Sequence, residues 1–173
     1  MHQSRALIKV VLKDYALPRF GIHGISHWAR VLENGLRLAR LTGANKEVVR
    51  LFALLHDSKR INETLDPGHG LRGADFAKTL RGRLFDLTDQ EFDLLFEACA
   101  AHTDGKTEGD VTVQTCWDAD RLDLIRAGIT PDPRFLCTTA AKDPEIILWA
   151  NARSESRLAP DFIHSEWFAD NIE

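Results

Sequence analysis

Apolar residues recur at helical spacing along most of the chain. In the first segment Leu7, Ile8, Val11 and Leu12 share one face, and Pro18 ends it. A spacing of three or four residues is typical of an amphipathic helix, whereas strict alternation would indicate a strand. No long segment alternates, so the pattern predicts an all-α fold, a single-domain helical bundle over residues 1–173. The expected helices cover residues 4–17, 25–41, 47–57, 71–82, 88–102, 111–127 and 144–157.

Capping signals support several of these boundaries. Gly43 suits the left-handed residue that closes a helix, and Asn45 suits the cap of the next. Thr88 and Glu91 form a capping-box pattern ahead of the fifth helix. A C-terminal helical tail is expected over residues 133–173, with its aromatic residues packed onto the bundle.

The central segment 47–57 carries the first candidate chemistry. An unbroken apolar run from Leu51 to Leu55 leads directly into His56 and Asp57. A helix that is apolar on nearly every side belongs in a core, and aspartate is almost never fully buried unless it is paired. One cation bound by His56 and Asp57 would satisfy both side chains.

Other histidines and aspartates fall on the inner faces of separate helices. At about 100° per residue, the helix at 111–127 places Asp120 within an apolar stripe and Asp118 and Asp123 outside it. His102 extends the apolar stripe of the fifth helix, and His27 lies at the edge of the apolar sector of the second. Any one of these would more often be a paired core residue, but several on separate helices are typical of helical metal sites.

The types of donor atom restrict which metal ions could bind. Imidazole and carboxylate without thiolate favour Mn, Fe, Ni, Co or Zn, whereas Mg and Ca prefer oxygen alone. The sequence therefore predicts a divalent transition metal in a metal-binding core over residues 22–128.

Charge and composition restrict the partners. The net charge of −4 argues against bulk nucleic-acid or anionic-membrane binding, although a local basic pocket for one phosphate is still allowed. The three cysteines are too few and too scattered for a disulfide framework or a cysteine zinc site, and they fit a reducing, cytoplasmic location. No signal peptide is evident and no apolar run approaches the roughly 20 residues that span a bilayer. The tail aromatics could also serve a homo-oligomer.

These residues resemble a known signature. His27 in His-Trp-Ala-Arg-Val, the His56-Asp57 doublet and Asp120 in Asp-Ala-Asp-Arg-Leu-Asp look like the H…HD…D pattern of the HD-domain superfamily of metal-dependent phosphohydrolases. The resemblance covers residues 27–120. It implies an all-α fold and assigns metal ligation to His27, His56, Asp57 and Asp120.

Some branches of the superfamily add two histidines and bind a second metal that the doublet's aspartate bridges. His102 and His69 could fill that role here, so that one or two ions are expected, although His69 could equally bind substrate or cap a helix. His2, His23 and His164 are expected at the surface, although the i, i+4 spacing of His23 and His27 would also let both point inward. Nucleotidases and guanosine-tetraphosphate hydrolases of the superfamily carry a glutamate three residues after the doublet, where this chain has Arg60, with Glu63 displaced nearby. The Gly-Tyr-Pro motif of the cyclic-di-GMP phosphodiesterases is absent, so none of their substrates is implied.

The working hypothesis is hydrolysis of a small anionic phosphate ester or nucleotide by metal-activated water. The expected catalytic residues are Asp57, His102, Arg60 and Lys59, and the expected substrate-binding residues are Lys59, Arg60, His69 and Arg72. Two alternatives remain open at this point. One is a di-iron oxygenase of the same fold, and the other is a non-catalytic module in which the metal holds the helices or the pocket binds a ligand.

Overall fold

A computed structural model describes residues 2–163 and Trp167. Within this part of the chain the structure contains seven α-helices, two short 3-10 helices and no strand, with only an isolated bridge between Arg81 and Phe85. The predicted all-α class is confirmed. The elements are α1 (His2–Lys13), α2 (Ile25–Thr42), α3 (Lys46–Leu55), α4 (His69–Leu80), α5 (Asp89–Ala101), α6 (Val111–Arg121), η1 (Leu124–Ala127), η2 (Pro133–Phe135) and α7 (Pro144–Glu155).

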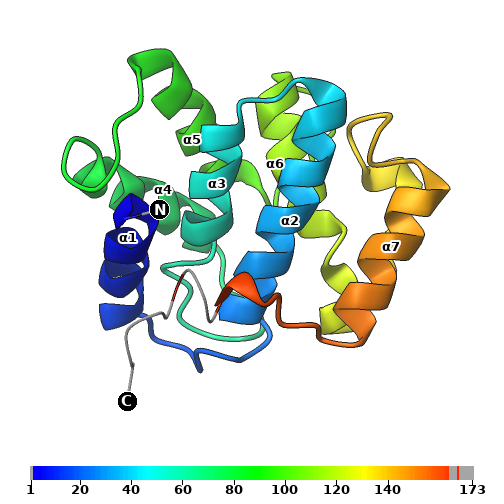
Figure 1. Cartoon of the computed structure of the whole chain (residues 1–173), viewed down its shortest axis with the longest axis horizontal. Coiled ribbons are helices and arrows are strands. Elements are labelled where there is room, and N and C mark those ends of the chain that lie inside the picture. The colour runs from blue at the N-terminus through cyan, green and yellow to red at the C-terminus, as the bar shows by residue number, and fades with distance from the viewer. Residues whose placement is uncertain (1, 164–166, 168–173) are drawn as a thin grey trace.

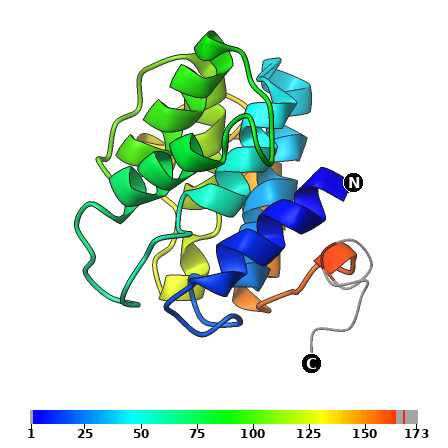
Figure 2. The same cartoon turned by 90° about the vertical axis from the view of Figure 1, so that its left-hand side faces the viewer.

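The helices form a bundle around α2, α3, α5 and α6 (Figure 1). Helix α7 lies beyond α2 on one side, whereas α1, α4 and α5 lie on the other side of α3, and Figure 2 shows α1 crossing in front of α2. Trp28, Phe52 and Trp117 are fully buried in the main core. A smaller apolar cluster, which includes Leu38, Leu122 and Ile146, packs α7 against the bundle.

The predicted caps form as hydrogen bonds. The Asn45 side chain accepts from the backbone N–H groups of Glu47 and Val48, and Thr88 and Glu91 complete a reciprocal capping box. Gly43 closes α2 in the left-handed region at φ 78°. These caps fix where α3 and α5 begin, and hence where their far ends deliver side chains.

Several helices end earlier than predicted. The first ends at Lys13, and α3 ends at Leu55, so that the chain turns at His56 and Asp57. The segment expected as one helix over 111–127 is an α-helix only to Arg121, followed by η1. The turn after α3 lets adjacent side chains serve one site, which neighbours on a continuous helix could not do.

The tail contributes to the core where it is described. Phe162 is half-buried, Trp167 is almost fully buried, and their rings meet edge to face with centroids 5.2 Å apart. Phe168, which was expected to pack with them, lies outside the described residues. None of the helices in the described part of the chain is both long and apolar enough to cross a membrane.

Candidate metal centre

Six side chains from five helix ends or faces meet in the interior. His27 lies in the first turn of α2, Asp120 near the end of α6, and His69 at the start of α4. His56 and Asp57 follow α3, and His102 follows α5. All six are at least 91% buried, so their donor atoms face one another rather than solvent. The structure thus brings together His27, His56, Asp57, His69, His102 and Asp120.

Five of the six residues form two groups that share Asp57, with His27 and His56 in one and His69 and His102 in the other. Asp120 lies beside the first group, its Oδ1 3.4 Å from His27 Nε2. Asp57 Oδ2 lies 3.6 Å from Nε2 of both His27 and His56. The other oxygen, Oδ1, lies 3.1 Å from His69 Nε2 and 3.6 Å from His102 Nε2. Each group keeps its ligand atoms within 4.8 Å of one another, which is compact enough for one ion. One carboxylate therefore presents one oxygen to each of two candidate metal positions.

The outer nitrogens of the histidines fix which nitrogen faces inward. Nδ1 of His56, His69 and His102 lies 2.7–3.1 Å from the backbone carbonyls of Phe52, Asp66 and Cys99, respectively. A carbonyl oxygen can only accept, so each Nδ1 carries the proton and each neutral ring turns an Nε2 lone pair inward.

His27 follows the same pattern, with Nδ1 2.8 Å from the Asp123 carboxylate. Its Nε2 lies 3.1 Å from His56 Nε2, and His69 Nε2 lies 2.9 Å from His102 Nε2. Two facing lone pairs cannot hydrogen bond to each other, whereas a cation near each pair would satisfy both.

The carboxylates are incompletely satisfied. Asp57 Oδ1 and Asp120 Oδ1 are buried and accept no hydrogen bond within the described structure. Burial acts to raise the pKa of Asp57, but the surrounding imidazoles outweigh it and hold the pKa well below its usual range. Burial also lowers the pKa of His56 to about 3, which keeps this ring neutral. Ionised carboxylates and neutral imidazoles are the forms that bind metal, so this donor set fits divalent transition ions.

Asp118 and Asp123 were expected to point away from the core, and that prediction is wrong. Asp118 is fully buried, and its carboxylate is satisfied there by hydrogen bonds from the backbone N–H groups of Cys137 and Thr138. Asp123 is buried because α6 ends at Arg121, which turns Asp123 toward His27 and the guanidinium of Arg30. Helical periodicity fails at Asp123 because the residue lies beyond the helix.

A cavity of about 340 Å³ opens onto this centre. Arg60 lines it, with Nη1 3.0 Å from His69 Nε2. Arg60 was predicted from the sequence as a catalytic and substrate-binding candidate. Arg126, which was not predicted, places Nη2 3.5 Å from Asp120 Oδ1. Only the turn of η1 brings Arg126 inward, so the helical pattern gave no signal for it. The lining includes Ile22, His23, Asp57, Arg60, Glu63, Thr64, His102, Thr103, Asp120, Leu124, Arg126, Ala127 and Ile129.

Lys59 and Arg72 lie apart from the cavity lining. The Lys59 ammonium lies over the Phe76 ring, 3.9 Å from its centroid. Arg72 pairs with both oxygens of Asp66 and donates to the Lys59 carbonyl. These contacts stabilise the loop between α3 and α4 rather than the cavity.

His23 was expected at the surface, and that expectation is wrong, because the residue is 92% buried. The alternative given by its spacing to His27, that it points inward, is the one the structure shows. Its Nδ1 lies 2.5 Å from Glu63 Oε2, and both residues line the cavity. Gly21 makes room for this contact, because a Cβ at Gly21 would collide with the Glu63 carboxylate. His164 and the side chain of His2, also expected at the surface, lie outside the described part of the structure.

Comparison with known proteins gives two matches to this architecture. The family model described as HD domain matches residues 24–125. A crystal structure of a predicted HD superfamily hydrolase from an uncultured Thermotogales bacterium is similar, with a TM-score of 0.63 and 27% sequence identity over 88% of this chain and 85% of that chain. No curated protein matches the sequence.

Proposed function

The chain belongs to the HD-domain family, and we propose that it is a metal-dependent phosphohydrolase that cleaves a small anionic phosphate ester or nucleotide with metal-activated water. The observation that carries this proposal is the convergence of four inward Nε2 lone pairs on the two oxygens of Asp57. The name of the similar Thermotogales protein, a predicted hydrolase, agrees with it.

The donor set supports two ions. His27, His56, Asp57 and Asp120 would hold the first, and Asp57, His69 and His102 the second. When bound, such ions lower the pKa of water and polarise a phosphoryl oxygen. The protein contributes a fixed geometry, because the hydrogen bonds to Nδ1 set each ring before metal arrives.

Arg60 and Arg126 are proposed to bind the phosphoryl group. Both guanidiniums line the cavity and are largely buried, where a charge-assisted hydrogen bond is stronger than in water. Each is already oriented, since Arg60 donates to the carbonyls of Asn62 and Thr64, and Arg126 to that of Ile22. A cavity of about 340 Å³ suits a small substrate.

We assign the proton from the attacking water to the His23 and Glu63 pair. Glu63 holds the Nδ1 proton of His23, which leaves the Nε2 lone pair as acceptor. Burial lowers the pKa of His23, which favours the neutral, accepting ring. The pair supplies an acid-base group in a chain that has Arg60 where other branches have glutamate.

A di-iron oxygenase is the second candidate, and an Asp57 shared between two pairs of histidines favours it specifically. Iron content and oxygen consumption distinguish it from the hydrolase. In a third, non-catalytic alternative the centre only holds the helices together, and the cavity beside it argues against that role.

The test combines elemental analysis with hydrolysis of p-nitrophenyl phosphate, nucleoside monophosphates and sugar phosphates, on protein purified without chelator. Wild type should hold close to two ions and hydrolyse at least one substrate, and Asp57→Ala should lose both properties. Asp75→Ala, on the exposed face of α4, is the matched control and should keep both. Metal-loaded protein that hydrolyses none of these esters would contradict the proposal.

A further inference from the structure

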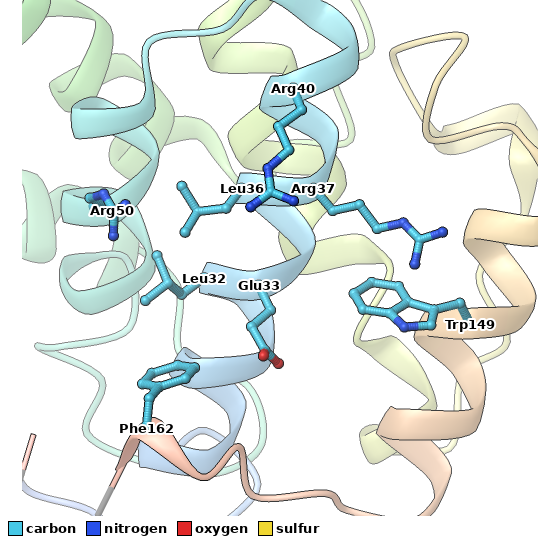
Figure 3. Close-up of a pocket in the computed structure, with 8 residues that line it drawn as sticks. All are labelled: Leu32, Glu33, Leu36, Arg37, Arg40, Arg50, Trp149 and Phe162. Carbon is cyan, nitrogen blue, oxygen red and sulfur yellow. The ribbon is translucent and has the colours of Figure 1, made fainter. Parts of the chain in front are cut away.

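A second cavity, of about 490 Å³, lies between α2, α3, α7 and Phe162 (Figure 3). It shares no lining residue with the cavity at the metal centre. We call it the arginine cleft. Its lining is Leu32, Glu33, Leu36, Arg37, Arg40, Arg50, Trp149 and Phe162.

The cleft carries an excess of positive charge. Arg37 and Arg40 lie one turn apart on α2, and Arg50 lies on the neighbouring α3. None of the three makes an ion pair with another described residue. The carboxylate in the cleft, Glu33, already pairs with Arg153 of α7. Because the whole protein has a net charge of −4, this excess is local rather than general.

Trp149 fixes one of the guanidiniums. The Arg37 guanidinium lies over its ring, 4.4 Å from the centroid, and Arg153 stacks on the same ring at 4.3 Å. Stacking restricts the long side chain while leaving its N–H groups free to donate. In Figure 3, Arg40 extends from α2 toward the middle of the same group of side chains.

The rest of the lining is apolar. Leu32 is 9% exposed, and Leu36 and Phe162 are half-buried against the main core. A ligand in the cleft would meet both guanidinium donors and aliphatic and aromatic carbon. The cavity volume lies in the range of small-molecule sites.

We infer that the arginine cleft binds a small organic phosphate whose apolar or aromatic body packs on Leu32, Leu36 and Phe162. Guanidinium forks from two helices suit a phosphate, which offers several oxygens at once. This inference does not rest on the proposed function, because the cleft and the metal centre share no residue.

The experiment is calorimetric titration of chelator-treated protein with 1-naphthyl phosphate, so that hydrolysis cannot intervene. Wild type should bind the probe, and the double variant Arg40→Gln with Arg50→Gln should bind at least tenfold more weakly. Arg83→Gln removes an exposed arginine elsewhere and should bind as wild type does. Neutral 1-naphthol should bind at least tenfold more weakly than 1-naphthyl phosphate.

Arg60→Gln separates this site from the metal centre. Unchanged binding in Arg60→Gln, together with loss in the double variant, would support the cleft as the site. Loss in Arg60→Gln with full binding in the double variant would overturn the inference, because the probe would then occupy the metal cavity. Absence of binding to wild type, or equal binding of 1-naphthol, would overturn it as well.

Discussion

The histidines of the centre are fixed before any ion binds. His56, His69 and His102 each donate Nδ1–H to a backbone carbonyl three or four residues earlier, and His27 donates to Asp123. Asp123 is in turn held by Arg30, which is 97% buried. Since each ring has one outer partner, its inward nitrogen has one direction, and little rotamer entropy remains to be lost on metal binding.

At this scale the Glu63 carboxylate gives the clearest catalytic prediction. Glu63→Gln keeps the size of the side chain but removes the charge that orients His23, so kcat should fall by roughly 100-fold, the lower end for a lost acid-base group. Steady-state kinetics with metal content measured on the same sample would check this. Glu97→Gln, at an exposed position of α5, should leave kcat unchanged.

A fall in metal content that matches the fall in kcat would contradict that role and make Glu63 a residue of the metal site. Glu63→Asp provides a second test, because it keeps the negative charge of the carboxylate. Partial recovery of kcat in Glu63→Asp relative to Glu63→Gln is expected if the carboxylate orients His23.

At the scale of elements, the positions where helices end determine which side chains reach the metal centre. Asp120 could be predicted because it lies within the regular part of α6, on an apolar stripe. Asp123 and Arg126 could not, because they follow Arg121, where helical angles no longer apply. The burial of His23 was not predicted for a related reason, since it lies in a joint between helices, where periodicity gives no signal for its contact with Glu63, 40 residues later.

The close packing of helix α4 against α3 and α5 was also not predicted by sequence periodicity. A Cβ at Gly73 would lie 2.5 Å from the Leu55 carbonyl oxygen, and one at Gly70 would lie 2.4 Å from that of Cys99. These glycines let α4 approach the ends of α3 and α5 closely. That approach is what brings His69 to Asp57.

Gly73→Ala should therefore destabilise the protein although alanine favours helix. Helix propensity alone would stabilise by about 1 kcal/mol, but overpacking against backbone costs about 1–3 kcal/mol. Urea unfolding should show a lower free energy of unfolding, and affinity for the second ion should fall as His69 moves. Asp75→Ala, on the exposed face of α4, is expected to be neutral or stabilising. Stabilisation by Gly73→Ala would show that α4 can shift freely.

At the scale of the molecule, the centre joins segments that are far apart in the sequence. His27 and Asp123 are 96 residues apart, and five helices contribute a ligand directly or at the turn that follows. The all-α class and the separate helices followed from local periodicity, as did the inward direction of Asp120. The pairing of helices around Asp57 did not, because it depends on contacts between segments that periodicity within each helix cannot specify.

Metal should accordingly stabilise the whole fold, because an unfolded chain has no preformed site. At a free metal concentration 100 times Kd, linkage adds about 2.7 kcal/mol, which for a chain of this length raises Tm by roughly 5–10 °C. Calorimetric scans of chelator-treated protein, with and without added Mn²⁺, would measure the shift. Asp57→Ala should lose most of it because both ligand groups use Asp57, whereas Asp75→Ala should retain it. An equal shift in Asp57→Ala would place the stabilising ion elsewhere and remove the physical basis of the two-ion centre.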